Sequence, residues 1–217
     1  MKRTHPDDVS TTLWDTFAKQ ESLNEDQLEQ FKLYAQLLVQ WNELSNLTTV
    51  VSQEGIIATH FQDSLALGHA IDLTTTKSLL DVGSGAGFPG VALKIKYPNL
   101  QVRLMEVNNK KIAFLDEVIT RLNLADTFIY DIDWRTFLRK TEQSIELFVA
   151  RASLHPDELM RMFKPSCPYN HAQLIYWASR YYELSPKEQP YFTREFTYTI
   201  KGKMSKLLFF SSSKEKQ

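Results

Sequence analysis

The sequence predicts an α/β fold with a mostly parallel sheet, and three observations lead to this prediction. Short apolar strands alternate with helical segments at intervals of about 20 to 27 residues. A glycine-rich stretch follows the first strand, and near the C-terminus two strands are joined at a single glycine. Strands connected through helices pair in parallel, whereas strands joined by a short turn pair antiparallel. We therefore expect a seven-stranded sheet whose last strand is antiparallel.

The first 70 residues are expected to form a helical cap. Apolar residues recur at helical spacing between Leu28 and Leu44, and a second apolar helical pattern covers residues 55–71. Ser22-Leu23-Asn24-Glu25 has the spacing of a capping box, which predicts Ser22 as the N-cap of the first of these helices. The predicted division is a helical cap over residues 1–70 and a sheet domain over residues 71–217.

The sheet domain contains all the predicted strands. They span residues 78–82, 102–105, 128–130, 147–150, 174–177, 192–200 and 207–210, with Gly202 as the turn between the last two. In an open parallel sheet, ligands bind beyond the carboxyl ends of the strands. We therefore expect the binding site at the glycine-rich stretch that follows residue 82.

Composition excludes several classes of protein. The 217 residues include a single cysteine, Cys167, so an internal disulfide is excluded and a reducing compartment is favoured. No apolar run approaches the ~18 residues that a membrane span needs, and no signal-peptide pattern follows Met1. His60 has no second His or Cys at ligand spacing, so no metal site is expected. These features predict a soluble cytoplasmic protein without a membrane partner.

The charge is unevenly distributed along the chain. Its formal net charge is −1, but residues 1–70 carry a net charge of −6 and residues 194–217 carry +4. A basic end on an acidic protein can contact phosphate locally while the global field stays weak. An equally good interpretation is a solvated lysine tail that maintains solubility. Charge alone does not decide between these alternatives.

The glycine-rich stretch has the properties of a nucleoside-binding loop. It reads Asp81-Val82-Gly83-Ser84-Gly85-Ala86-Gly87-Phe88-Pro89-Gly90, and glycines at alternate positions allow a sharp turn and a close approach to a ligand. Glu106 ends the second strand 19 residues after Gly87, where a carboxylate can accept hydrogen bonds from ribose hydroxyls. Asp81 favours S-adenosylmethionine, whose amino-acid end is cationic. Gly85-x-Gly87-x-x-Gly90 also satisfies the dinucleotide fingerprint, so a nucleotide-linked oxidoreductase stays an alternative, as does a tight loop without a ligand.

Upstream motifs then make a family recognisable. Trp41-Asn42, Asn46-Leu47-Thr48 and His60-x-x-Asp63-Ser64-Leu65 precede the glycine loop, Lys110-Lys111 is followed by Phe114-Leu115, and Ala150-Arg151-Ala152 ends the fourth strand. This arrangement, from about residue 31 to 155, resembles the glucose-inhibited division protein B family, the small-subunit (16S) ribosomal RNA guanine N7-methyltransferases. The resemblance implies a Rossmann-like class I methyltransferase fold and S-adenosyl-L-methionine as cofactor.

The resemblance also implies positions for the site residues. Together with the glycine loop and Glu106, it predicts these cofactor-binding residues: Gly83, Gly85, Gly87, Phe88, Glu106, Asp133, Trp134, Arg135 and Arg151. The predicted substrate-binding residues are Asn46, His60, Asp63, Lys110, Lys111 and Arg180. Arg151 is the best candidate for orienting the substrate, and no acid or base is assigned. The chain departs from the family pattern at Trp134-Arg135, where a small residue and an acid are usual, and after residue 155.

The function that these residues predict is methylation of N7 of a guanine in 16S ribosomal RNA, with ribosomal RNA or the small ribosomal subunit as partner and a monomer as the working form. The alternative is a divergent, non-catalytic RNA-binding or ribosome-assembly protein on the same fold. Equally, a polar network that ties the cap to the sheet could be formed by Asn46, Thr48, His60, Asp63 and Ser64. The basic residues expected to contact RNA are Arg151, Lys110, Lys111, Lys201, Lys203 and Lys206.

Overall fold

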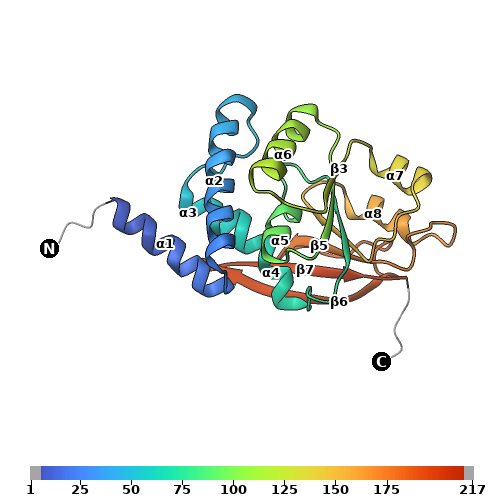
Figure 1. Ribbon diagram of the computed structural model, residues 1–217. Helices are drawn as coiled ribbons and strands as arrows, with labels where there is room; N and C mark the ends of the chain where they lie inside the picture. The colour runs from blue at the N-terminus through green and yellow to red at the C-terminus, as the bar shows by residue number, and fades with distance from the viewer. Residues whose placement is uncertain (1–5, 213–217) are drawn as a thin grey trace.

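Seven strands form one sheet in the order β3-β2-β1-β4-β5-β7-β6, in a computed structural model that describes residues 6–212 (Figure 1). The strands are β1 (Ser78–Val82), β2 (Gln101–Met105), β3 (Thr127–Tyr130), β4 (Leu147–Arg151), β5 (Gln173–Ser179), β6 (Phe192–Ile200) and β7 (Lys203–Phe210). The strands β1 to β5 pair in parallel, and β7 runs antiparallel to both β5 and β6. The predicted fold class is confirmed, including the antiparallel last strand.

Helices cover both faces of this sheet (Figure 1). They are α1 (Pro6–Glu21), α2 (Glu25–Ser45), α3 (Gln53–Gly55), the π-helical η1 (Ile56–Gln62), α4 (Asp63–Ala70), α5 (Gly90–Lys96), α6 (Asn109–Arg121), α7 (Trp134–Lys140), α8 (Pro156–Leu159) and the 3₁₀ turn η2 (Met160–Phe163). Within residues 6–212, no helix combines the length and the apolar composition that crossing a bilayer requires.

The predicted N-cap of α2 is wrong by two residues. Asn24 is the N-cap: its Oδ1 accepts from the Gln27 N–H at 2.8 Å, and Gln27 Oε1 accepts from the Asn24 N–H at 3.1 Å. Ser22 instead has a left-handed φ of 50° and donates its N–H to Lys19 O at 3.3 Å. Ser22 thus closes α1, and a residue in that conformation cannot also provide the extended backbone of an N-cap.

The N-terminal helices share a hydrophobic core with the sheet. Phe17 of α1, Phe31 of α2 and Phe61 of η1 are each 1% exposed or less, and they belong to one cluster with Leu79 and Leu104 of the central strands. A second cluster on the opposite face includes residues of α7, α8 and η2. The helical cap is therefore packed directly on the sheet, which positions η1 beside the carboxyl end of β4. Residue 70 as a domain boundary stays a prediction.

Candidate functional site

A cleft of about 420 Å³ lies beyond the carboxyl ends of β1 to β4. Its lining residues are Leu47, Thr48, His60, Val82, Gly83, Ser84, Gly85, Ala86, Phe88, Met105, Glu106, Val107, Lys111, Ile132, Asp133, Trp134, Arg151, Ala152, Ser153 and Leu154. This volume falls within the ~300–1,000 Å³ that is usual for small-molecule sites. The position is the one predicted for an open parallel sheet.

The glycines of the loop have different surroundings. Gly83, Gly85 and Gly87 have φ values of 70°, 59° and 90°, which favour glycine. A Cβ added at Gly85 would meet no atom within 4 Å, whereas a Cβ at Gly87 would lie 2.6 Å from both Tyr34 Oη and Val91 Cγ2. Gly85 therefore faces the cleft. Gly87, predicted to bind the cofactor, is not among the lining residues and instead permits close packing of the loop on the core.

Glu106 ties the glycine loop to the end of β2. Its Oε2 accepts from the Gly85 N–H at 2.9 Å, and its Oε1 accepts from the N–H groups of Val107 at 2.9 Å and Asn108 at 3.0 Å. Only 7% of the residue is exposed, yet it lines the cleft. A carboxylate has about four acceptor positions, so Glu106 retains capacity for a ligand hydroxyl.

Asp81 lies beneath the loop rather than in the cleft. It is fully buried, and its Oδ2 accepts from the Gly90 N–H at 2.8 Å. Burial raises the pKa of this carboxyl to about 7, against the effect of the Gly90 hydrogen bond and of the Arg151 charge. Asp81 is not among the lining residues, so its role here is to hold the start of α5.

His60 forms one wall of the cleft with Phe88. The two rings stack with centroids 4.6 Å apart and 13° between their planes. His60 Nε2 lies 2.9 Å from Thr48 Oγ1, and its Nδ1 lies 3.5 Å from Arg151 Nη2. Because a guanidinium only donates, we assign the proton of the neutral ring to Nε2. Burial and the Arg151 charge lower the His60 pKa to about 4, so the ring is neutral at pH 7.

Arg151 is held against η1 and the first residue of α4. Its Nη1 donates to Thr59 O at 3.1 Å and to Asp63 Oδ2 at 2.9 Å, and its guanidinium lies 5.2 Å from the Phe88 ring centroid. The other oxygen of Asp63, Oδ1, accepts from the Tyr198 hydroxyl at 2.6 Å. Asp63 is therefore part of a polar network that joins the cap to the sheet, while Arg151 and His60 also line the cleft.

The predicted cofactor-binding segment at the start of α7 lies only partly in the cleft. Asp133 is the N-cap of α7 and accepts from the Thr136 N–H at 3.0 Å. Trp134 is buried and donates from Nε1 to Glu158 O at 3.0 Å, and both residues line the cleft. Arg135 is not among the lining residues. Its Nε donates to Glu158 Oε1 at 2.7 Å on the neighbouring α8.

Most of the remaining predicted substrate residues lie outside the cleft lining. Asn46 is the C-cap of α2, with a φ of 47°, and is next to the lining residue Leu47. Of the two lysines that open α6, Lys111 lines the cleft and Lys110 does not. Arg180 follows β5, and its guanidinium lies 4.4 Å from the Tyr181 ring centroid. The structure therefore brings only Lys111 of these residues into the cleft.

None of the predicted site residues lies in the segment that directly follows β4. Ala152, Ser153 and Leu154 all line the cleft, and the Ser153 Oγ is buried with no hydrogen-bond partner in the part of the chain that the structure describes. Their signal was available, because they directly follow a predicted strand at the edge where ligands bind. Because its Oγ is itself buried, Ser153 contributes to the wall of the cleft with its other atoms.

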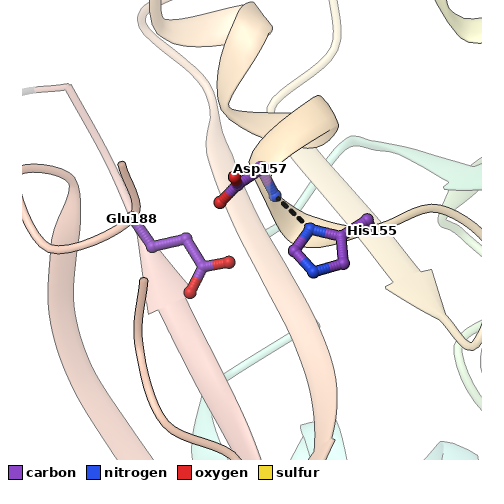
Figure 2. Close-up of side chains that lie close together, drawn as sticks. All are labelled: His155, Asp157 and Glu188. Carbon is purple, nitrogen blue, oxygen red and sulfur yellow. Dashed lines mark hydrogen bonds between the residues drawn. The ribbon is translucent and has the colours of Figure 1, made fainter. Parts of the chain in front are cut away.

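A separate cluster has the composition of a metal site. Ligand atoms of His155, Asp157 and Glu188 all lie within 4.8 Å of one another. Figure 2 shows the three side chains close together. These side chains already have protein partners: His155 Nδ1 accepts from the Asp157 N–H, Asp157 Oδ2 lies 3.2 Å from Lys187 Nζ, and Glu188 Oε1 accepts from the Tyr182 hydroxyl at 2.6 Å. Contacts with other protein groups therefore account for the position of each of the three side chains.

Comparisons with known proteins agree with this geometry. The family model GidB, described as rRNA small subunit methyltransferase G, matches residues 27–205. A protein of Lachnoclostridium phytofermentans named Ribosomal RNA small subunit methyltransferase G is 53% identical over 102 residues, 47% of this chain and 42% of that protein. The protein of the same name from Bacillus velezensis is 38% identical over 151 residues, 69% of this chain and 63% of that protein. The chain therefore spans about half the length of the curated relatives that it matches.

Solved structures share the fold at low sequence identity. A human methyltransferase 10 domain containing protein has a TM-score of 0.55 and 14% identity, covering 69% of this chain and 80% of its own. A mutant of MtNAS in complex with S-adenosylmethionine has a TM-score of 0.55 and 15% identity, covering 95% and 79%. The fold is thus that of Rossmann-like methyltransferases, and since the family model matches most of the sequence, the chain belongs to the GidB family of rRNA small subunit methyltransferase G.

Proposed function

We propose that this protein is an S-adenosyl-L-methionine-dependent methyltransferase that modifies N7 of a guanine in small-subunit (16S) ribosomal RNA. One observation carries the proposal: the glycine loop, Glu106 and Arg151 line a single cleft in a chain of this family. The curated relatives have names that state the same class of reaction and the same class of RNA. Family membership favours this function over the non-catalytic alternative and over a nucleotide-linked oxidoreductase.

The residues of the cleft fit the cofactor. The open space at Gly85 admits a ligand against the backbone, and Glu106 retains an acceptor for a ribose hydroxyl. Ser153 follows Arg151 and also lines the cleft. The side chains of Met105 and Ile132 give the cleft apolar walls against which a flat base can lie. The predicted contacts of Gly83, Phe88, Asp133 and Trp134 belong to the same proposal.

When it is bound, S-adenosylmethionine supplies a methyl group on a positively charged sulfur. Guanine N7 has a free lone pair on the major-groove edge of the base, so no side chain must remove a proton from it. The protein can then act mainly by holding the base and the cofactor close together in the correct orientation. In such a mechanism, the ionisable side chains of the cleft hold the base and the cofactor in place and transfer no proton.

Arg151 and His60 are the residues that we propose orient the guanine. The Arg151 guanidinium can donate to guanine O6 and leave the N7 lone pair free. His60 is flat against Phe88 and neutral at pH 7, so it adds no further positive charge beside a cationic cofactor. Asn46, Asp63, Lys110, Lys111 and Arg180 stay proposed substrate residues, and Asp63 would act by holding Arg151.

The form of the RNA follows from the geometry of nucleic acids. The major groove of A-form RNA is too deep and narrow for side chains to reach N7. The target guanine must therefore be unstacked, or lie in a loop of ribosomal RNA or of a partly assembled small ribosomal subunit. A monomer that acts in the cytoplasm stays a prediction from the sequence.

The test combines cofactor binding with methyl transfer. Calorimetry should show binding of S-adenosylmethionine, and the protein should then transfer a labelled methyl group to small-subunit RNA but not to large-subunit RNA. Mass spectrometry of the product should place the label on N7 of one guanine. RNA binding without transfer in the presence of bound cofactor would instead support the non-catalytic alternative.

A further inference from the structure

A second cavity adjoins the cleft on the other side of Arg151. It has a volume of about 340 Å³ and lies between η1, the carboxyl end of β5 and the β6–β7 hairpin. Its lining residues are Ala58, Thr59, Asp63, Arg151, Trp177, Ala178, Ser179, Tyr198, Ile200, Lys201, Lys203 and Ser205. Arg151 is the residue that lines both spaces. Anything bound in the second cavity would therefore lie directly beside the residue that we propose orients the target base.

The side chains that line this cavity favour an anion. Arg151, Lys201 and Lys203 provide three positive charges, and Asp63 is the acid among the lining residues. Both carboxylate oxygens of Asp63 are already engaged, one by Arg151 and one by the Tyr198 hydroxyl. The Asp63 carboxylate is thus bound to other lining residues, and positive charges outnumber negative charges in the lining of the cavity.

The three C-terminal lysines among the residues predicted to contact RNA differ in their ion pairing. Lys201 lines the cavity but forms an ion pair with Glu54. Lys206 does not line it and lies 3.2 Å from Glu195. Lys203 lines the cavity, is exposed, and has no ion-pair partner among the side chains of residues 12–212. Only Lys203 therefore offers an uncompensated ammonium group to a ligand.

Hydroxyl groups complete the polar lining. Thr59 and Ser179 line the cavity on the sides of η1 and β5, and hydroxyls of this kind donate to phosphate oxygens in nucleic-acid complexes. Cations together with hydroxyl donors are the usual partners of a phosphodiester, and such contacts fix the position of a strand without reading its sequence.

We propose that the second cavity binds a backbone phosphate of single-stranded RNA next to the target nucleotide. This inference rests on the proposed function, and it names the place where the substrate strand is anchored. Lys203 and the hydroxyls of Thr59 and Ser179 hold the phosphate, and Arg151 separates it from the base in the cleft. The C-terminal hairpin, most of which lies within the family match over residues 27–205, thereby contributes to RNA binding.

The test compares the wild type with two variants in a salt series. Binding of a fluorescent single-stranded RNA fragment of the small-subunit RNA is measured for wild type, Lys203→Gln and Lys206→Gln. Each phosphate contact contributes about −0.7 to the slope of log affinity against log salt concentration. Lys203→Gln should lower the magnitude of the slope by about 0.7. Lys206→Gln, the matched control on the same strand, should leave the slope unchanged because its charge is already paired.

A third variant tests the space itself. Ser179 is exposed at the end of β5, so Ser179→Tyr fills the cavity without disturbing the core. RNA affinity should fall at least about tenfold, while calorimetric affinity for S-adenosylmethionine stays at the wild-type value. If Lys203→Gln has the same slope as Lys206→Gln and Ser179→Tyr binds RNA normally, the proposed cavity site is wrong. That result would not affect the proposed function. The proposed function is wrong if the wild type transfers no methyl group to the RNA.

Discussion

The Glu106 carboxylate accepts a hydrogen bond from the Gly85 backbone N–H at 2.9 Å, so the two sequence features that predict a nucleoside site are joined directly. Glu106→Ala should weaken S-adenosylmethionine binding ~10–150-fold, because hydrogen bonds to a charged group contribute roughly 1.5–3 kcal/mol. Calorimetry measures this change. Glu142→Ala removes an exposed carboxylate outside the cleft and should bind normally. If Glu106→Ala lowers the affinity for S-adenosylmethionine less than twofold, Glu106 only holds the glycine loop in place.

Gly85→Val tests the placement of the cofactor against the backbone. The new side chain would enter the open space of the cleft, so cofactor affinity should fall by at least about tenfold. Gly202→Val is the matched control, since Gly202 also has a positive φ, 76°, and also faces open space. The two substitutions should destabilise the protein to a similar extent, and only Gly85→Val should weaken cofactor binding. Equal cofactor affinity in the two folded variants would contradict the placement.

His60 should make stability depend on pH. Its folded pKa of about 4 is below the unfolded value of 6.5, so the unfolded chain takes up a proton first as pH falls. The contribution of His60 is present above pH 6.5 and is lost toward pH 4. The difference in unfolding free energy between wild type and His60→Gln should therefore shrink from pH 7 to pH 5, by up to about 2 kcal/mol. Urea denaturation at both pH values measures it, and a constant difference would exclude a buried neutral ring.

Asp81 should have the opposite effect in the same pH range. Burial raises its folded pKa to about 7 from 3.8, so the contribution of the protonated carboxyl is full below pH 3.8 and is lost as pH rises through 7. Asp81→Asn keeps an acceptor for the Gly90 N–H and does not ionise. Relative to wild type, this variant should gain stability between pH 5 and pH 7 in denaturation experiments. Parallel pH profiles for the two proteins would show that Asp81 ionises normally.

Tyr198 should affect the rate of methyl transfer through Asp63. Tyr198→Phe removes the hydroxyl that donates to Asp63 at 2.6 Å, which should loosen Arg151 and lower the single-turnover rate several-fold with little change in cofactor affinity. Tyr182→Phe removes a hydroxyl that donates to Glu188, also at 2.6 Å, away from the cleft. The two variants should be similarly stable, and only Tyr198→Phe should be slow. Equal rates would assign Tyr198 a purely structural role.

Local patterns determined much of the fold and part of the site. Strand and helix periods depend on neighbouring residues, so the order of elements was readable, and β1 and β6 have their predicted bounds. The glycines at alternate positions and the carboxylate after β2 are likewise short-range features. The carboxyl-end rule then placed the cleft, because parallel strands bring their ends to one edge. The family motifs extended the prediction to His60 and Arg151, both of which line the cleft.

Only the tertiary structure decided which side of each element faces the cleft and which charges are compensated. Gly85 and Gly87 are equivalent in the sequence pattern, yet one faces open space and the other packs on Tyr34. Lys201 is paired with Glu54, 147 residues away, which no local pattern contains. Asp63 is likewise bound to Tyr198 across 135 residues. Sequence spacing encodes the backbone, whereas burial and ion pairing depend on residues that only folding brings together.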